Sequence, residues 1–272
     1  MVQVPVQIIP INPNLIILKP IQHFNPLFVP LQKELTAVIR AFGSSGTVLE
    51  NGKRNVIKIF PLGAINVNVK SFKIPKFYNK IVYRYFRKSK AKRSFEYANM
   101  LMQNGIGTPR PIAYFENYDT VGLHDSYYVS EHLQADLTYR ELVETDYPDS
   151  ENILRQFTAF SFQLHEKGIE FLDHSPGNTL IKKNEAGKYD FFLVDLNRMK
   201  FHRQMGFETR MKNLSRLTPK KEMVMIMSDE YAKLYSRPYV EVFDKMWGYT
   251  SQFQERYFRK RRLKKRFIFW KK

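Results

Sequence analysis

Residues 165–181 read HEKGIEFLDHSPGNTLI and residues 192–198 read FLVDLNR, and these two stretches decide the interpretation of the chain. In the first, Asp173 and Asn178 are five residues apart, in a loop that leads into an apolar run. In the second, Asp195 directly follows another apolar run. Because short apolar runs bounded by turn residues are typical of strands, these three polar side chains are expected at strand ends.

This spacing is that of a kinase catalytic loop followed by a metal-binding aspartate. Phosphoryl transfer needs an acceptor that orients the attacking hydroxyl, and hard oxygen ligands that hold Mg²⁺ on the nucleotide phosphates. Asp173 suits the first, catalytic role, whereas Asn178 and Asp195 suit the second, as metal ligands. The spacing by itself is common, and the alternative is a loop Asp and Asn that satisfy local backbone groups.

The first half of the chain predicts a β-rich lobe. Ile65, Val67 and Val69 alternate with polar residues, as in a half-buried strand. Similar short runs lie before this strand and, beyond a helical pattern, after it, which gives the order β, β, β, α, β, β. The predicted strands are 47–50, 55–60, 65–70, 111–115 and 126–130, and the predicted helix is 89–103.

Lys70, Glu96 and Gly52 lie where a kinase would need nucleotide-binding residues. A kinase uses a lysine of the third strand to contact the nucleotide phosphates and a helix glutamate to hold that lysine. Lys70 ends the third predicted strand, Glu96 lies on the helix that follows, and Gly52 lies in the turn that would cover the phosphates. The alternatives are that Lys70 and Glu96 are surface charges and that Gly52 belongs to an ordinary tight turn.

The second half predicts a helical lobe. Helices are expected at 137–143 and 152–166, a small hairpin is formed by 179–181 and 191–194, and the remainder shows helical spacing. The fold class is therefore α+β, with a β-rich N-lobe and a helical C-lobe. We divide the chain into a Pro-rich extended segment, the N-lobe, the C-lobe and a basic aromatic tail, at 1–30, 31–131, 132–255 and 256–272.

The net charge of +18 on 272 residues comes from two patches. Lys70–Arg93 and Arg256–Lys272 each contain ten basic residues and no acidic one. The other 231 residues carry 24 basic and 26 acidic side chains and are nearly neutral. Such local charge indicates a polyanionic partner, namely nucleic acid, anionic lipid or a phosphorylated glycan.

Several classes of protein are excluded by composition. The chain has no cysteine, so disulfides and Cys-ligated zinc or iron–sulfur sites are ruled out. Its six histidines show no paired zinc-ligand spacing; none is assigned a catalytic role, and His174 is expected only to line the loop. Residues 1–20 lack a basic n-region and are broken by prolines, and no apolar run approaches about 18 residues, so we expect neither a signal peptide nor a transmembrane helix. We expect a cytosolic protein or one attached to a membrane surface.

With these motifs in view, the chain resembles the bacterial lipopolysaccharide core kinases, which phosphorylate Kdo or heptose sugars and have a protein-kinase-like fold of two lobes. The resemblance runs from about Asn55 to Leu217, and it looks like the branch found in Bacteroidetes-type bacteria. It is closest in residues 89–96, 105–109, 165–181 and 195–199.

The resemblance implies a function and a location. It implies ATP and Mg²⁺ as nucleotide and metal, and a sugar hydroxyl of the lipid A inner core as the acceptor. It also implies a peripheral position on the cytoplasmic face of the inner membrane.

The chain departs from the usual kinase pattern at two places. Phe171-Leu172 stands where a kinase has His-Arg, and Asp195-Leu196-Asn197 stands where many have Asp-Phe-Gly. The missing Arg is the usual partner of a phosphorylated activation segment, so we expect no control by such phosphorylation. Phe171 is expected to pack in the core. Since the base and the metal ligands are present, we expect an active enzyme and not a pseudokinase.

The tail Arg256–Lys272 mixes basic residues with aromatic and aliphatic ones, as suits an anionic bilayer surface. A solvated helix end or a disordered tail is the alternative. The alternatives to a sugar kinase are a kinase-like protein with another acceptor, a nucleotide-binding pseudokinase and, less favoured, a nucleic-acid-binding protein.

Overall fold

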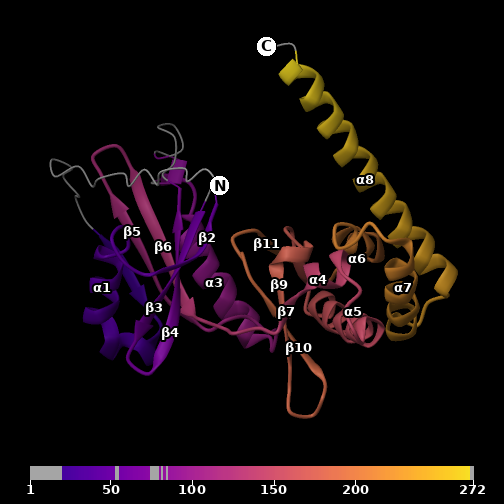
Figure 1. The fold of residues 1–272 in the computed structure, drawn as a ribbon, viewed down its shortest axis with the longest axis horizontal. Coiled ribbons are helices and arrows are strands. Elements are labelled where there is room, and N and C mark those ends of the chain that lie inside the picture. The colour runs from indigo at the N-terminus through magenta and orange to yellow at the C-terminus, as the bar shows by residue number, and fades with distance from the viewer. Residues whose placement is uncertain (1–19, 53–54, 74–79, 81, 84, 270–272) are drawn as a thin grey trace. The chain divides into compact units, whose positions relative to one another are not determined.

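The computed structural model describes residues 20–52, 55–73, 80, 82–83 and 85–269, and for 264–269 the description is limited to the helical backbone. The chain forms two compact units. Unit 1 contains the described residues up to Met100 together with Pro109–Leu133, and unit 2 contains Leu101–Thr108 and the chain from Gln134 onward. Figure 1 labels the elements of both units along the chain.

Unit 1 is built on an antiparallel sheet of six strands in the order β1-β5-β6-β4-β3-β2. The strands β3 and β4 form a hairpin and pair along their whole length, from Asn55 opposite Phe72 to Leu62 opposite Ile65. The predicted alternation is confirmed in β4, where Val67 and Val69 are fully buried. The strands are β1 (Ile21–Phe24), β2 (Thr47–Asn51), β3 (Asn55–Leu62), β4 (Ile65–Phe72), β5 (Pro111–Tyr118) and β6 (Leu123–Glu131).

Two helices cover opposite faces of this sheet. The helix α1 (Gln32–Arg40) packs on the face that carries Phe115, whereas α3 (Lys90–Gln103) packs on the face that carries Tyr114. Neighbouring residues of a strand point to opposite faces, which places the two helices on either side. The helix α3 was predicted, and α1 was not.

The Pro-rich segment is only partly described, because residues 1–19 lie outside the described part of the chain. Within the described part, β1 pairs with β5, as expected of an extended segment. The expectation is wrong for Pro26–Leu31, which form a 3-10 helix, η1. Asn25 caps this helix by accepting from the Leu27 N–H at 3.2 Å, and proline is tolerated in a first helical turn.

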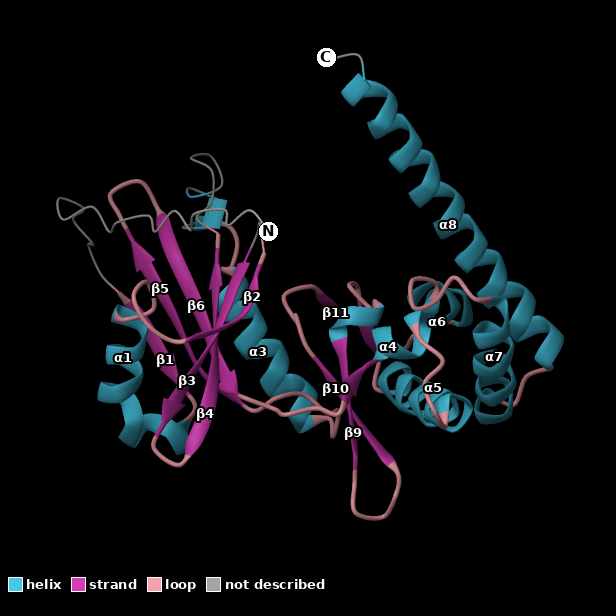
Figure 2. Ribbon diagram, viewed as in Figure 1, coloured by secondary structure: helices cyan, strands magenta, loops and turns pink. Residues whose placement is uncertain are grey.

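Unit 2 combines five helices of the described chain with short strand pairs (Figure 2). The predicted helix over 137–143 begins two residues later, because Leu137–Thr138 form the strand β7 and the Thr138 side chain caps α4. The helices are α4 (Tyr139–Glu144), α5 (Ser150–Glu166), α6 (Phe207–Leu214), α7 (Lys221–Tyr235) and α8 (Tyr239–Phe269), and the other short elements are β8 (Ile169–Phe171), η2 (Pro176–Asn178), β9 (Thr179–Lys183), β10 (Tyr189–Leu193) and β11 (Met199–Phe201).

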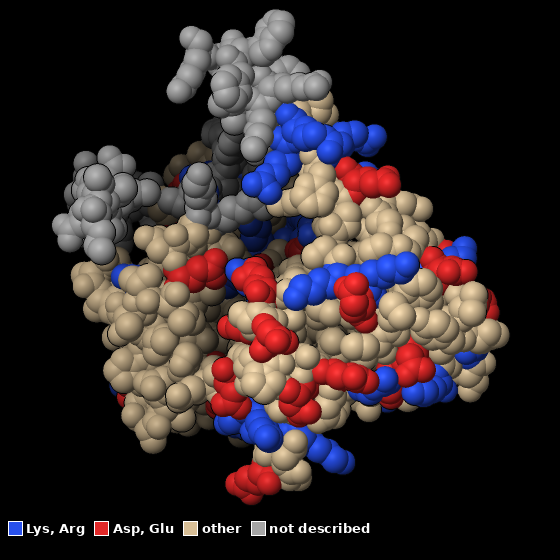
Figure 3. Space-filling model, turned by 45° about the vertical axis from the view of Figure 1, so that its right-hand side comes forward, with Lys and Arg blue, Asp and Glu red and all other residues tan. Residues whose placement is uncertain are grey.

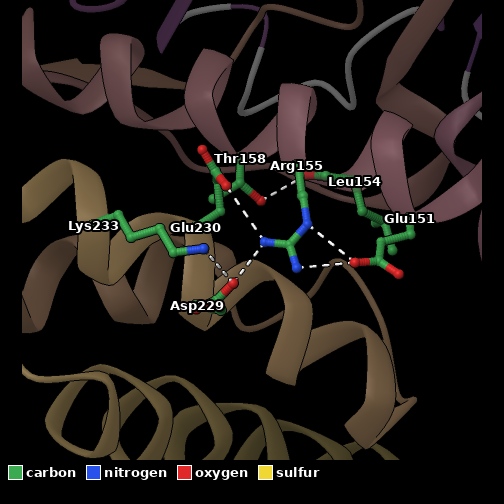
Figure 4. A network of polar contacts seen from close by, with 7 residues as sticks. All are labelled: Glu151, Leu154, Arg155, Thr158, Asp229, Glu230 and Lys233. Carbon is green, nitrogen blue, oxygen red and sulfur yellow. Dashed lines mark hydrogen bonds and ion pairs between the residues drawn. The ribbon is translucent and has the colours of Figure 1, made fainter.

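The core of unit 2 joins its helices. Tyr139 of α4, Phe157 of α5 and Tyr231 of α7 are fully buried in one apolar cluster. On the rim of this core, Arg155 of α5 reaches across to α7 and donates to Asp229 at 2.6 Å (Figure 4). Because this arginine is about one third exposed, at 31%, the ion pair adds little to the stability that apolar packing supplies.

The helix α8 extends beyond the rest of unit 2 and runs to Phe269, so the described part of the basic tail is helical (Figure 1). Across the described residues, no helix combines the length and the apolar character that a membrane span requires. Basic and acidic side chains are interspersed on the face drawn in Figure 3.

Candidate active site

The loop that carries Asp173 is fixed at both ends by strand pairing inside unit 2. Before the loop, β8 pairs with β11, with Phe171 opposite Met199. After the loop, β9 pairs with β10, with Thr179 opposite Leu193. The predicted hairpin of β9 and β10 is therefore confirmed. Because the strands β10 and β11 enclose residues 194–198, the two loops of interest lie side by side.

Asn178 and Asp195 are brought together by this arrangement. The Val194 N–H donates to the Asn178 carbonyl at 3.0 Å, which places Asn178 beside the residue that precedes Asp195. The Asn178 amide group donates from Nδ2 to the Asp173 carbonyl at 2.8 Å. This bond fixes the orientation of the amide, so Oδ1 is the atom that Asn178 can present to a cation.

The carboxylate of Asp173 is held by arginines from two other segments. Nη1 of Arg198 donates to Asp173 Oδ1 at 3.1 Å. Nη1 of Arg216 donates to the Leu172 carbonyl at 2.9 Å and lies 3.5 Å from the same Oδ1. Asp173 is about one fifth exposed, at 21%, so its carboxylate is both oriented by the protein and accessible from outside.

Asp195 adopts a left-handed backbone with φ of 59°, one of three non-glycine residues in the described chain with positive φ. Such a conformation costs on the order of 1 kcal/mol for a residue with a side chain, and it is commonly retained at functional sites. Asn197 donates from Nδ2 to Asp195 Oδ1 at 2.7 Å and fixes the carboxylate.

A layer of buried side chains supports the loop that carries Asp173. Phe171 is fully buried, which confirms the expectation that it packs in the core. Its carbonyl accepts from Asn213 Nδ2 at 2.8 Å, and Asn213 Oδ1 lies 3.1 Å from His165 Nε2. The other ring nitrogen of His165 lies 2.9 Å from the Tyr231 hydroxyl. Burial lowers the pKa of His165 to about 3, so the ring is neutral and serves as a structural hydrogen-bonding link.

Unit 1 carries the other predicted site residues. Lys70 lies near the end of β4, with its Nζ 5.6 Å from the centre of the Phe72 ring. Glu96 lies on α3 and accepts from Lys88 Nζ at 2.9 Å. A pairing of Lys70 with Glu96 stays a prediction. Gly52 follows β2, and its N–H donates to the Asn55 carbonyl at 3.0 Å, as in a tight turn.

The donor set in unit 2 fits magnesium. A carboxylate and an amide oxygen are hard oxygen ligands, which Mg²⁺ prefers, and it commonly binds one or two protein groups together with phosphate oxygens and water. No group of three or more His, Asp or Glu side chains in the described chain could hold a metal by itself.

Sequence reasoning missed the residues that position the loop, namely Arg198, Arg216, Asn213 and His165. Arg198 is close to the motif but 25 residues from Asp173, and Arg216 is 43 residues away. A polar or charged residue at such a distance carries no pattern that identifies its partner.

Comparison with known proteins identifies the family. Residues 72–237, more than half of the chain, match the model of the lipopolysaccharide kinase (Kdo/WaaP) family. The chain therefore belongs to this family. A comparison with curated proteins gave no match.

One solved structure supports the fold, and two others are similar at a lower TM-score. The structure of WaaP in complex with acyl carrier protein has a TM-score of 0.58 at 15% identity, over 88% of this chain and 97% of that one. The Rio2 kinase from Chaetomium thermophilum, in a complex with ADP, Mg²⁺ and phosphoaspartate, has a TM-score of 0.45 at 16% identity, over 79% and 66% of the two chains. A MAP kinase from Leishmania major has a TM-score of 0.44 at 18% identity, over 79% and 65%. The predicted α+β, protein-kinase-like fold is confirmed.

Proposed function

We propose that this protein is an ATP-dependent kinase that phosphorylates a Kdo or heptose hydroxyl of the lipopolysaccharide inner core. The observation that carries the proposal is that hydrogen bonds connect the loop of Asp173 and Asn178 to the residue before Asp195, in a chain of the Kdo/WaaP family. The branch of the family and the sugar accepted remain predictions from sequence.

In this proposal Asp173 is the general base. Its carboxylate accepts the proton of the sugar hydroxyl and aligns the oxygen for attack on the γ-phosphate. Arg198 and Arg216 hold the carboxylate in place, and the bond from Asn178 to the Asp173 carbonyl ties the base to the neighbouring metal ligand.

Asn178 and Asp195 would hold Mg²⁺, which when bound neutralises charge on the nucleotide phosphates. The left-handed backbone of Asp195 and the hydrogen bond from Asn197 orient its carboxylate before any ligand arrives. Lys70, Glu96 and Gly52 are the proposed nucleotide-binding residues of unit 1. Their roles rest on position in the sequence and on the resemblance.

We also propose that the basic end of α8 attaches the protein to the anionic cytoplasmic face of the inner membrane, beside a lipid-linked acceptor. In its described part this end exposes Phe258 and Leu263 next to basic side chains, which suits an interface of lipid head groups. Co-sedimentation with vesicles containing anionic lipid tests this, and binding equal to that with neutral vesicles would contradict it.

The test of the function is transfer of labelled γ-phosphate from ATP with Mg²⁺ to purified Kdo-lipid A. Wild type should transfer label, and Asp173→Ala should lower the rate by about 10²-fold or more while ATP binding is retained. Asp195→Ala should lose Mg²⁺-dependent nucleotide binding as well. The control is Asp190→Ala, an exposed carboxylate on β10 five residues before Asp195, which should transfer label as wild type does.

The outcomes separate the alternatives. ATP binding without transfer by wild type would indicate a different acceptor or a pseudokinase. A nucleic-acid-binding protein would be favoured by a different pattern. Wild type would then fail to bind ATP but bind an oligonucleotide tightly, and Asp173→Ala would leave that binding unchanged.

A further inference from the structure

Unit 2 contains an open groove of about 620 Å³ next to the catalytic loop. The groove is lined from three sides, by the loop and strand pair of β8 and β11, by the end of α6 and by α8. Its volume is that of a site for a small ligand or a ligand head group. Its lining includes Lys200, Lys212, Arg216, Phe253, Tyr257 and Lys260.

The lining is strongly basic. Five of its described residues are Lys or Arg, and a single one, Glu170, is acidic. Glu170 is itself held by His202, whose Nε2 lies 2.8 Å from the carboxylate. Within the described part of the chain, Lys200, Lys212 and Lys260 have no carboxylate at ion-pair distance. These charges are not neutralised locally, so the groove attracts anions.

The wall formed by α8 adds aromatic surface. Phe253, Tyr257 and Lys260 line the groove together with Tyr249 and are three to four residues apart, so one face of the helix points toward it. The Phe253 and Tyr257 rings stack with centres 6.4 Å apart. The Arg216 guanidinium lies 5.5 Å from the Phe253 ring centre. A flat apolar wall between cations suits a sugar that carries acidic groups.

Arg216 connects the groove to the proposed base. This arginine lines the groove, donates to the Leu172 carbonyl and reaches Asp173 Oδ1. Leu172 also lines the groove and precedes Asp173 directly. A glycan lying in the groove would therefore contact Leu172 and Arg216, the two residues that adjoin the proposed base.

We propose that this groove is the acceptor subsite, and that it binds phosphate or carboxylate groups of an anionic glycolipid while a neighbouring sugar hydroxyl meets Asp173. The inference rests on the proposed function and adds to it the surface that selects the acceptor. The acidic groups of the sugar are recognised by Lys200, Lys212, Arg216 and Lys260, and its carbon face packs on the aromatic wall.

The test compares two variants with the same loss of charge. Lys212→Gln with Lys260→Gln removes two exposed cations of the groove, and Lys182→Gln with Lys188→Gln removes two exposed cations of the β9–β10 hairpin outside it. Assays use the full chain in detergent, so that attachment to a bilayer makes no difference. We expect the groove variant to raise the KM for Kdo-lipid A about tenfold, with kcat and the KM for ATP little changed. The hairpin variant should match wild type.

A direct binding measurement separates this inference from the proposed function. The probe is the deacylated, phosphorylated lipid A disaccharide, compared with the same disaccharide after removal of its phosphates. Wild type and the hairpin variant should bind the phosphorylated probe, and the groove variant should bind it about tenfold more weakly. If wild type transfers no phosphate but this pattern holds, the proposed function fails and the anionic glycan site stands.

Two results would overturn the inference. One is equal KM and equal probe binding by the two double variants, since the groove would then have no special role. The other is an equal loss of affinity for a DNA oligonucleotide of similar charge, since the groove would then be a general polyanion surface.

Discussion

We expect His174→Leu to make unit 2 more resistant to acid. His174 follows the proposed base directly, is 1% exposed and packs between Phe157 and Phe171, each 5.6 Å away between ring centres. Among the described residues, neither of its ring nitrogens has a hydrogen-bond partner. Burial dominates and lowers the pKa of His174 to about 4. Asn213 has the opposite, smaller effect, and its amide already bonds to Phe171 and His165.

The sign and size of the effect follow from proton linkage. In the unfolded chain the pKa is at its ordinary value of 6.5, so below pH 6.5 the unfolded state binds a proton that the folded state refuses until about pH 4. Stability is therefore lost as pH falls from 6.5 toward 4. One pH unit corresponds to about 1.4 kcal/mol, so the loss at His174 between pH 7 and pH 5 is about 2 kcal/mol.

The assay is urea unfolding at pH 7 and pH 5, followed by tryptophan fluorescence. Trp247 packs against the core of unit 2, so its fluorescence reports on the unfolding of that unit. His174→Leu should equal or exceed wild-type stability at pH 7, by up to about 1 kcal/mol, because a buried unpaired polar group is removed. At pH 5 its advantage should grow by about 2 kcal/mol. Parallel loss of stability by both proteins between the two pH values would refute the reasoning. Phe157→Leu in the same cluster is the control, because it should lower stability equally at both.

Two further predictions concern residues that support the loop of Asp173. Gly168→Ala should destabilise unit 2 by about 3 kcal/mol in the same urea assay, because Gly168 has φ of 68° and a Cβ would lie 2.1 Å from the His202 carbonyl oxygen. A loss below about 1 kcal/mol would show that the backbone relaxes easily. Arg198→Gln should lower kcat about tenfold with the KM for ATP little changed, because a positioning contact to Asp173 is removed. Steady-state kinetics check this, with partial rescue expected in Arg198→Lys, and a change in the KM for ATP alone would contradict it.

The parts of the fold that the sequence predicted are those whose signals are local. Alternation over Ile65, Val67 and Val69 reports directly which face of a strand is buried, and β4 has that pattern. The helix α1 has a comparable signal, since Leu35 and Ile39 are four residues apart and both are buried. This signal is short, because α1 has nine residues and directly follows the proline-containing η1.

In the candidate site, too, some residues could be predicted from local sequence and others could not. Asp173, Asn178 and Asp195 could be found because their spacing is set by one loop and one hairpin. Arg198 and Arg216 could not be assigned, because their contact with Asp173 depends on the pairing of β8 with β11 and on how α6 ends. The groove is still less predictable, since it is formed by elements from Glu170 to Lys260 that share no motif.

The replacement of the usual kinase arginine by Leu172 is linked to the positions of Arg198 and Arg216. Where a kinase has an arginine just before its catalytic aspartate, this chain has a leucine, but two arginines from later in the chain supply positive charge at the Asp173 carboxylate. Arg216 donates a hydrogen bond to the backbone carbonyl of Leu172. Its positive charge therefore lies at the position where other kinases carry the arginine. Because the same arginine lines the basic groove, the group that would orient the base would also contact an anionic acceptor bound there. Positioning of the base and recognition of the acceptor would then share one side chain, and neither would require a phosphorylated segment.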